Sequence, residues 1–240
     1  MQNNQERILE LNKKLVGHLQ ATGIQNAVVY VPHKPAEYWK PGNVRIAFCN
    51  EEPYSTDGNF EQGITTIDGD TLDAWSDGNR TIKMEFDINY CIRHALKTGK
   101  TLTEQDIVQL KEQTKPNAKD YYNKYEEMDK SLYFNFRYSI PTDTASAHTG
   151  YIQKAYETDS FYAHHYKEFL QATDPKVLVL GSEFGTKLFT LIFPELQGKL
   201  VYCGEPVILD GRVVISIPHP SRISNAQIAD VVNKISKALG

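Results

Sequence analysis

The sequence has few cysteines, and those it has follow no metal-binding or disulfide pattern. Its three cysteines, Cys49, Cys91 and Cys203, are widely spaced and form no CxxC motif. This argues against a disulfide-stabilised scaffold and against a structural zinc site. We therefore expect reduced, intracellular thiols and no bound metal.

The sequence also lacks long apolar runs and a large net charge. No apolar run approaches the roughly 20 residues of a membrane helix, and the first residues, MQNNQERILELNKK, are too charged for a signal peptide. We expect a cytoplasmic protein with no membrane partner. With 26 basic and 30 acidic side chains the formal net charge is −4, which argues against a strongly basic nucleic-acid coat but permits a small basic patch.

What remains is the composition of an ordinary globular protein. The chain has 240 residues, of which 40% are hydrophobic and 23% charged, so it is long enough to bury a core without a disulfide or a metal. We expect one domain over residues 1–240, and a monomer.

Short apolar strands alternate with helical patterns along the chain. Apolar periodicity predicts a helix over 5–20, and residues 55–80 resemble a long loop because they are rich in Gly, Asp, Asn and Thr. The other predicted helices cover 84–97, 103–115, 159–172 and 183–192, and a last helix is capped by Ser224 or Asn225. The predicted strands cover 44–49, 131–138, 176–181 and 213–217. This alternation predicts a three-layer α/β/α sandwich with a mostly parallel central sheet.

Polar side chains follow several of these strands directly. Glu51 and Glu52 follow the first strand, Asn135 lies in the second, and His219 follows the last. Because ligands bind at the carboxyl ends of parallel strands, these side chains should meet in one crevice. A carboxylate, an amide and a histidine suit chemistry at a glycosidic or amide bond.

Each of these side chains also has a purely structural interpretation. A Glu-Glu pair before a turn is typical of solvated surface, a buried amide such as Asn135 can satisfy a neighbouring loop, and His219 can simply hold the Pro-His-Pro turn. The convergence of all three on strand ends favours the functional interpretation.

Six segments, in order along the chain, then carry a resemblance to a known family. They are VRIAFCNEEPY at 44–54, GITTI at 63–67, SLYFNF at 131–136, TASAHT at 144–149, KVLVLG at 176–181 and HPSRIS at 219–224. Together they resemble the motifs of the main uracil-DNA glycosylase family. The resemblance implies an enzyme that flips uracil from single- or double-stranded DNA and hydrolyses its N-glycosidic bond without a metal or cofactor.

The resemblance also implies roles for individual residues. Glu52 matches the carboxylate that orients water and stabilises the oxocarbenium sugar, with Glu51 as the alternative. The remaining matches are Asn135 for reading the uracil edge, His219 for stabilising the leaving base, Tyr54 for covering the C5 face, Ser221 for gripping a phosphate and Ile223 for the wedge that enters the base stack.

Several pocket positions depart from the family pattern. Glu52 replaces an aspartate, Asn50 replaces a glycine where backbone approaches the ligand, and Thr66 replaces the phenylalanine that stacks on uracil. Arg222 replaces a proline and adds a positive charge. The insert at about 68–130 has no assigned counterpart.

These departures leave three functions open. The first is a divergent DNA glycosylase, which requires a local basic rim for which Arg137, Lys187 and Arg222 are the candidates. The second is a catalytically inactive protein that binds nucleic acid or a nucleoside-like ligand. The third is an N-glycoside hydrolase of free nucleosides, which needs no phosphate contacts.

Overall fold

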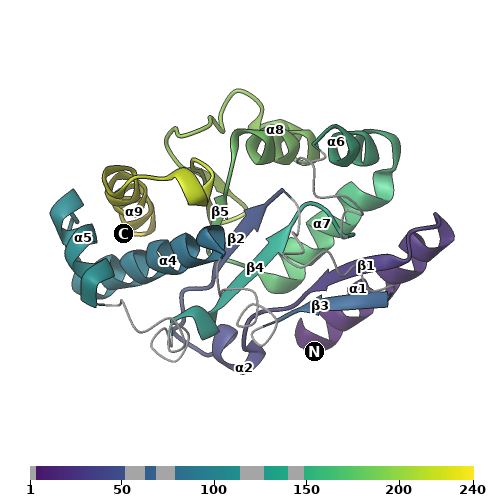
Figure 1. Cartoon of the computed structure of the whole chain (residues 1–240), viewed down its shortest axis with the longest axis horizontal. Helices are drawn as coiled ribbons and strands as arrows, with labels where there is room; N and C mark the ends of the chain where they lie inside the picture. The colour runs from purple at the N-terminus through teal and green to yellow at the C-terminus, as the bar shows by residue number, and fades with distance from the viewer. Residues whose placement is uncertain (1–3, 52–62, 69–78, 114–126, 140–148) are drawn as a thin grey trace.

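A computed structural model describes residues 4–51, 63–68, 79–113, 127–139 and 149–240 (Figure 1). The protein is a mixed α/β structure built on a five-stranded, mostly parallel central sheet. In spatial order its strands are β4 (Ser131–Asn135), β2 (Ile46–Asn50), β5 (Val177–Leu180), β7 (Arg212–Ser216) and β6 (Val207–Leu209). The first four are parallel, and β6 pairs antiparallel with β7 at the edge.

The central strands are covered on both faces, as their continuously apolar sequences require. Alternate residues of β2 belong to different cores: Ala47 and Cys49 face one, and Ile46 and Phe48 face the other. On the first face lie α1 (Asn4–Ala21), α6 (Thr149–Thr158), α7 (Ser160–Thr173) and α8 (Glu183–Ile192). On the second lie α4 (Arg80–Thr98), α5 (Glu104–Gln113) and α9 (Asn225–Leu239). Sheet and helices therefore form three layers.

A second, two-stranded sheet consists of β1 (Asn26–Tyr30) and β3 (Gly63–Ile67), which are parallel. It joins the chain after β4 through an antiparallel bridge between Ala27 and Ser139, so β1 runs opposite to β4. The expected loop over 55–80 is therefore wrong at β3. Its Ile64, Thr65 and Thr66 are β-branched, but only Ile67 of this strand is buried, so its apolar signal is weak.

Side-chain caps fix where several helices begin. Asn79 accepts hydrogen bonds from the backbone of Thr81 and Ile82, which starts α4 four residues before the expected position. Asp159 caps α7 and separates it from α6, a helix that the sequence patterns did not predict. Ser224 forms a capping box with Gln227 and starts α9 as expected.

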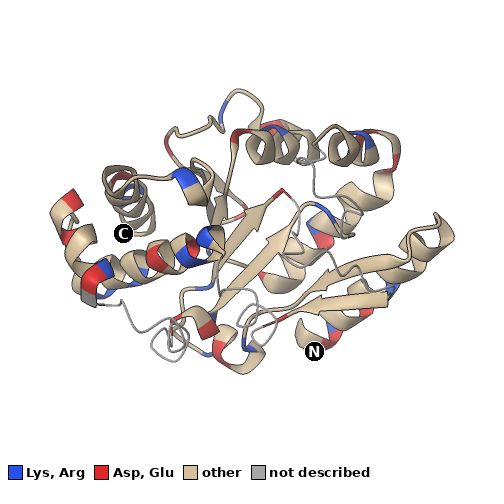
Figure 2. Ribbon diagram, in the orientation of Figure 1, with Lys and Arg blue, Asp and Glu red and all other residues tan. Residues whose placement is uncertain are grey.

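The remaining short elements are α2 (Pro35–Tyr38), η2 (Met128–Lys130), η3 (Pro194–Leu196) and η4 (Pro220–Arg222). Among the described residues, no helix is both long and apolar enough to cross a membrane. Acidic and basic side chains are interspersed over the helices (Figure 2).

Candidate functional site

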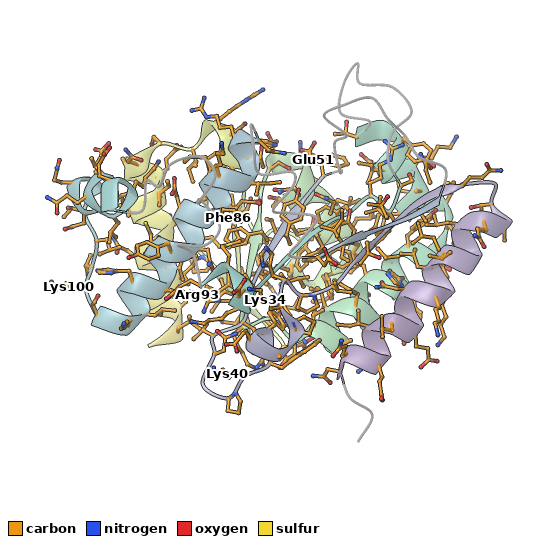
Figure 3. The ribbon with its side chains drawn as sticks, turned by 60° about the horizontal axis from the view of Figure 1, so that its bottom comes forward. Lys34, Lys40, Glu51, Phe86, Arg93 and Lys100 are labelled. Carbon is orange, nitrogen blue, oxygen red and sulfur yellow. The ribbon has the colours of Figure 1, made fainter. Side chains whose placement is uncertain are left out.

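Among the polar residues expected to converge, Glu51, Asn135 and His219 are described, and each ends or follows a strand at the carboxyl edge of the central sheet. Asn50 ends β2 and pairs in register with Asn135, the last residue of β4. On the other side of β2, the backbone N–H of Gly181 donates to the Cys49 carbonyl at 3.0 Å. Glu51 follows Asn50 at this edge (Figure 3). Glu52 and Tyr54 lie outside the described residues.

A buried carboxyl group, Glu85, joins this edge from α4. Its Oε1 accepts a hydrogen bond of 2.7 Å from the Nδ2 of Asn50, and Glu85 is 1% exposed. Burial raises the pKa of Glu85 to about 8, and the hydrogen bond from Asn50 only partly opposes that increase. Glu85 is therefore protonated over much of the neutral range. A strongly shifted carboxyl group at a strand-end edge is typical of functional sites.

Gly181 is required by the close approach of Asn50. A Cβ added to Gly181 would lie 1.9 Å from the Asn50 Oδ1 and 3.2 Å from the Cδ of Pro220. The Oδ1 is itself buried and has no hydrogen-bond partner among the described residues. The end of β2, the turn after β5 and the loop after β7 thus pack directly together.

Asn135 is fully buried, and its amide is used inside the fold. Its Nδ2 donates to the Tyr30 hydroxyl at 3.1 Å, and its Oδ1 accepts from the Tyr133 hydroxyl at 3.3 Å. Tyr30 in turn donates to the carbonyl of Arg137 at 2.9 Å. These two bonds use one N–H and one lone pair of the amide.

His219 precedes η4, which packs against α4, and its ring is half-buried. Its Nδ1 lies 2.8 Å from the Ser221 Oγ and accepts the backbone N–H of Ser221 at 3.3 Å. Because Nδ1 acts as acceptor, the neutral ring carries its proton on Nε2. Burial, together with the charge of Arg222, lowers the pKa of His219, so the ring is neutral at pH 7.

Two of the expected site residues differ from the prediction, Ile223 in its burial and Thr66 in its location. Ile223 is 5% exposed and packs in the core formed with α4 and α9, so it does not form the exposed wedge predicted from the sequence. Thr66 lies at the opposite edge of the sheet, in a hollow of about 470 Å³ with His33 and Trp39. The backbone N–H of His33 donates to the carbonyl of Ser131, the first residue of β4. This hollow therefore lies at the amino end of β4, whereas Asn135 lies at its carboxyl end.

The three residues expected to form a basic rim differ in their surroundings. Arg222 is exposed on η4. Arg137 is half-buried, donates to the Ser139 hydroxyl at 3.1 Å and lies 4.9 Å above the Tyr151 ring. Lys187 pairs with Glu183 at 2.8 Å.

Sequence reasoning missed Glu85, although a signal was available. Ile82, Glu85, Asn89 and Ile92 recur at helical spacing along one buried side of α4. A carboxylate within an apolar stripe must be paired or protonated when buried, so this position was a candidate for a perturbed acid. Among the described residues, no group of three or more His, Cys, Asp or Glu side chains is placed to hold a metal ion.

Comparison with known proteins adds no further assignment. No family model matches the chain, and a search of curated proteins finds no significant match.

Proposed function

We propose that this chain is a divergent member of the uracil-DNA glycosylase superfamily that hydrolyses the N-glycosidic bond of a flipped uracil or related base in DNA. The observation that carries the proposal is the meeting of Asn50, Glu85 and the His219 loop at the carboxyl edge of a parallel sheet. The motif resemblance supports the same assignment.

In this proposal His219 stabilises the leaving base. As the glycosidic bond breaks, negative charge develops on the base, and the Nε2–H of a neutral imidazole can donate to its oxygen. Ser221 fixes the required tautomer by donating to Nδ1. The lowered pKa of His219 keeps the ring a neutral donor at pH 7.

The carboxylates after β2 act on the sugar. Glu52, or Glu51 beside it, orients the attacking water and stabilises the positive charge of the oxocarbenium sugar. The Glu51 carbonyl accepts the backbone N–H of Arg137 at 3.1 Å, which fixes the start of this segment against the chain leaving β4. No step requires a metal or cofactor.

The first test is an abasic-site assay on single-stranded and duplex oligonucleotides that contain uracil. We expect cleavage by the wild-type chain, and a rate loss of about 10²-fold or more in Glu52→Gln. Glu51→Gln identifies which carboxylate acts on the sugar. Absence of cleavage combined with tight DNA binding would instead indicate a catalytically inactive binder.

A hydrolase of free nucleosides is the second candidate, and the packing of Ile223 favours it. A core position for Ile223 removes the side chain expected to enter the base stack, and a free nucleoside needs no such wedge. Arg222→Ala separates the candidates, because it should weaken cleavage of DNA but leave hydrolysis of deoxyuridine unchanged.

A further inference from the structure

A cationic hollow lies at the amino edge of the central sheet, at the opposite end of α4 from Glu85. It has a volume of about 420 Å³, within the range of small-molecule sites. Its charged lining residues are Lys40, Arg93, Lys97, Lys130 and Glu127, so four positive charges face one negative charge. Figure 3 shows Arg93 and Lys40 on the side of the molecule away from Glu51.

Arg93 is the structural centre of the hollow. Its guanidinium donates to neutral oxygens: Nε to Asn89 Oδ1 at 3.3 Å and Nη1 to Asn43 Oδ1 at 2.9 Å. Its Nη2 donates to the Lys130 carbonyl at 3.0 Å and to the Ser131 Oγ at 3.1 Å. Within the described residues no carboxylate lies within ion-pair distance of it. Glu127, which also lines the hollow, is the carboxylate that acts on Arg93 electrostatically from beyond ion-pair distance. One carboxylate does not balance the four basic side chains of the hollow, and an anion bound there would supply the missing negative charge.

The lysines around Arg93 are also available to a ligand. Lys97 is exposed in the last turn of α4, and neither it nor Lys130 forms an ion pair in the part of the chain that the structure describes. Lys40 forms an exposed i,i+3 pair with Glu37 at 3.2 Å, which is easily exchanged for a stronger anion. Burial lowers the pKa of Arg93 to about 10, so the guanidinium keeps its charge at neutral pH.

We propose that this hollow binds a diphosphate group, either free or as part of a nucleotide. A concave site of this volume suits a small ligand rather than a protein surface or a nucleic-acid strand. Ammonium groups act as point charges for phosphoryl oxygens, and the guanidinium adds fixed N–H donors. The site is separate from the carboxyl edge, so it does not depend on the proposed glycosylase activity.

The test is calorimetric titration of the full chain with pyrophosphate at low ionic strength. We expect measurable binding that weakens about tenfold in Lys97→Gln and in Lys40→Gln, because each removes one charge-assisted contact. The matched control is Lys100→Gln, which removes an exposed charge just beyond α4 and outside the hollow. Its affinity should equal that of the wild type.

Further titrations identify the source of the diphosphate. ATP that binds much more tightly than pyrophosphate would assign the site to a nucleotide, and equal affinities would assign it to the free diphosphate. The proposal is overturned if pyrophosphate does not bind at millimolar concentration, if citrate binds as tightly, or if Lys100→Gln weakens binding as much as Lys97→Gln.

Discussion

At the scale of single residues, the two asparagines that end β2 and β4 differ in what surrounds them. Asn135 has hydrogen-bond partners on both ends of its amide, Tyr30 and Tyr133. Asn50 donates to Glu85 and has a buried oxygen without a partner among the described residues. The sequence predicted that both would lie at the edge. Tyr133 is a local partner within β4, but Tyr30 and Glu85 come from β1 and α4, which no local pattern connects to these asparagines.

The raised pKa of Glu85 predicts how stability depends on pH. Its pKa is raised in the folded state, so between about pH 4.5 and pH 8 the folded state holds a proton that the unfolded state has lost. The free energy of unfolding should therefore fall as pH rises through this window, by at most about 1.4 kcal/mol per pH unit. Urea denaturation at several pH values measures the slope.

Glu85→Gln should flatten that dependence and be more stable than the wild type near pH 8, because the glutamine is neutral at every pH. The matched control is Glu195→Gln, which changes an exposed acid in η3 and should leave the slope unchanged. An unaltered slope in Glu85→Gln would show that Glu85 is ionised in the folded protein.

At the scale of elements, the packing of β2, β5 and the loop after β7 depends on a glycine. Gly181 gives the Asn50 side chain and Pro220 the space that a Cβ would occupy. This contact joins the ends of three segments that are distant in sequence. It therefore sets where His219 lies relative to Glu85.

Gly181→Ala should destabilise the protein by about 1–3 kcal/mol, because the new methyl group forces Asn50 or Pro220 to move. The matched control is Gly17→Ala in α1, where a Cβ meets no atom within 4 Å. That substitution should stabilise the protein by about 0.5–1 kcal/mol through helix propensity. Chemical denaturation of both variants tests the pair, and a Gly181→Ala variant as stable as the wild type would contradict the described packing.

The elements also show which parts of the fold the sequence could predict. Strands β2, β5 and β7 and helices α1, α8 and α9 follow strong apolar patterns with clear end signals, and they lie within two residues of the predicted bounds. β6 has three residues and an exposed Ile208, and β3 is mostly exposed. Their pairing depends on neighbouring strands rather than on their own sequences, so periodicity did not predict them.

At the scale of the whole molecule, the central sheet has two chemically different edges. The carboxyl edge holds Glu85, whose pKa is raised to about 8 by burial, and His219, whose pKa is lowered by burial, so both side chains are mainly neutral at pH 7. The amino edge holds the cationic hollow around Arg93. α4 spans both, since Glu85 near its start contacts Asn50 and Arg93 near its end contacts Asn43.

The arrangement of the candidate site could be predicted only in part, because some of its contacts join segments that are far apart in the sequence. Strand order brings Asn50, Asn135 and the His219 loop to one edge, which the alternation of strands and helices implies. The position of Thr66 could not be predicted this way, because β3 belongs to a separate sheet whose carboxyl end lies at the amino end of β4. The burial of Ile223 depends on how α9 packs on α4, which is equally non-local.

The measurement that tests the proposed activity most directly is the amount of free base released from uracil-containing duplex DNA by the wild type and by His219→Gln. We predict that the wild type releases free uracil over repeated turnovers, and that His219→Gln is slower by about 10²–10³-fold because it loses the donor to the leaving base. No release of uracil from DNA, or equal release by the two proteins, would contradict the proposed role of the His219 edge.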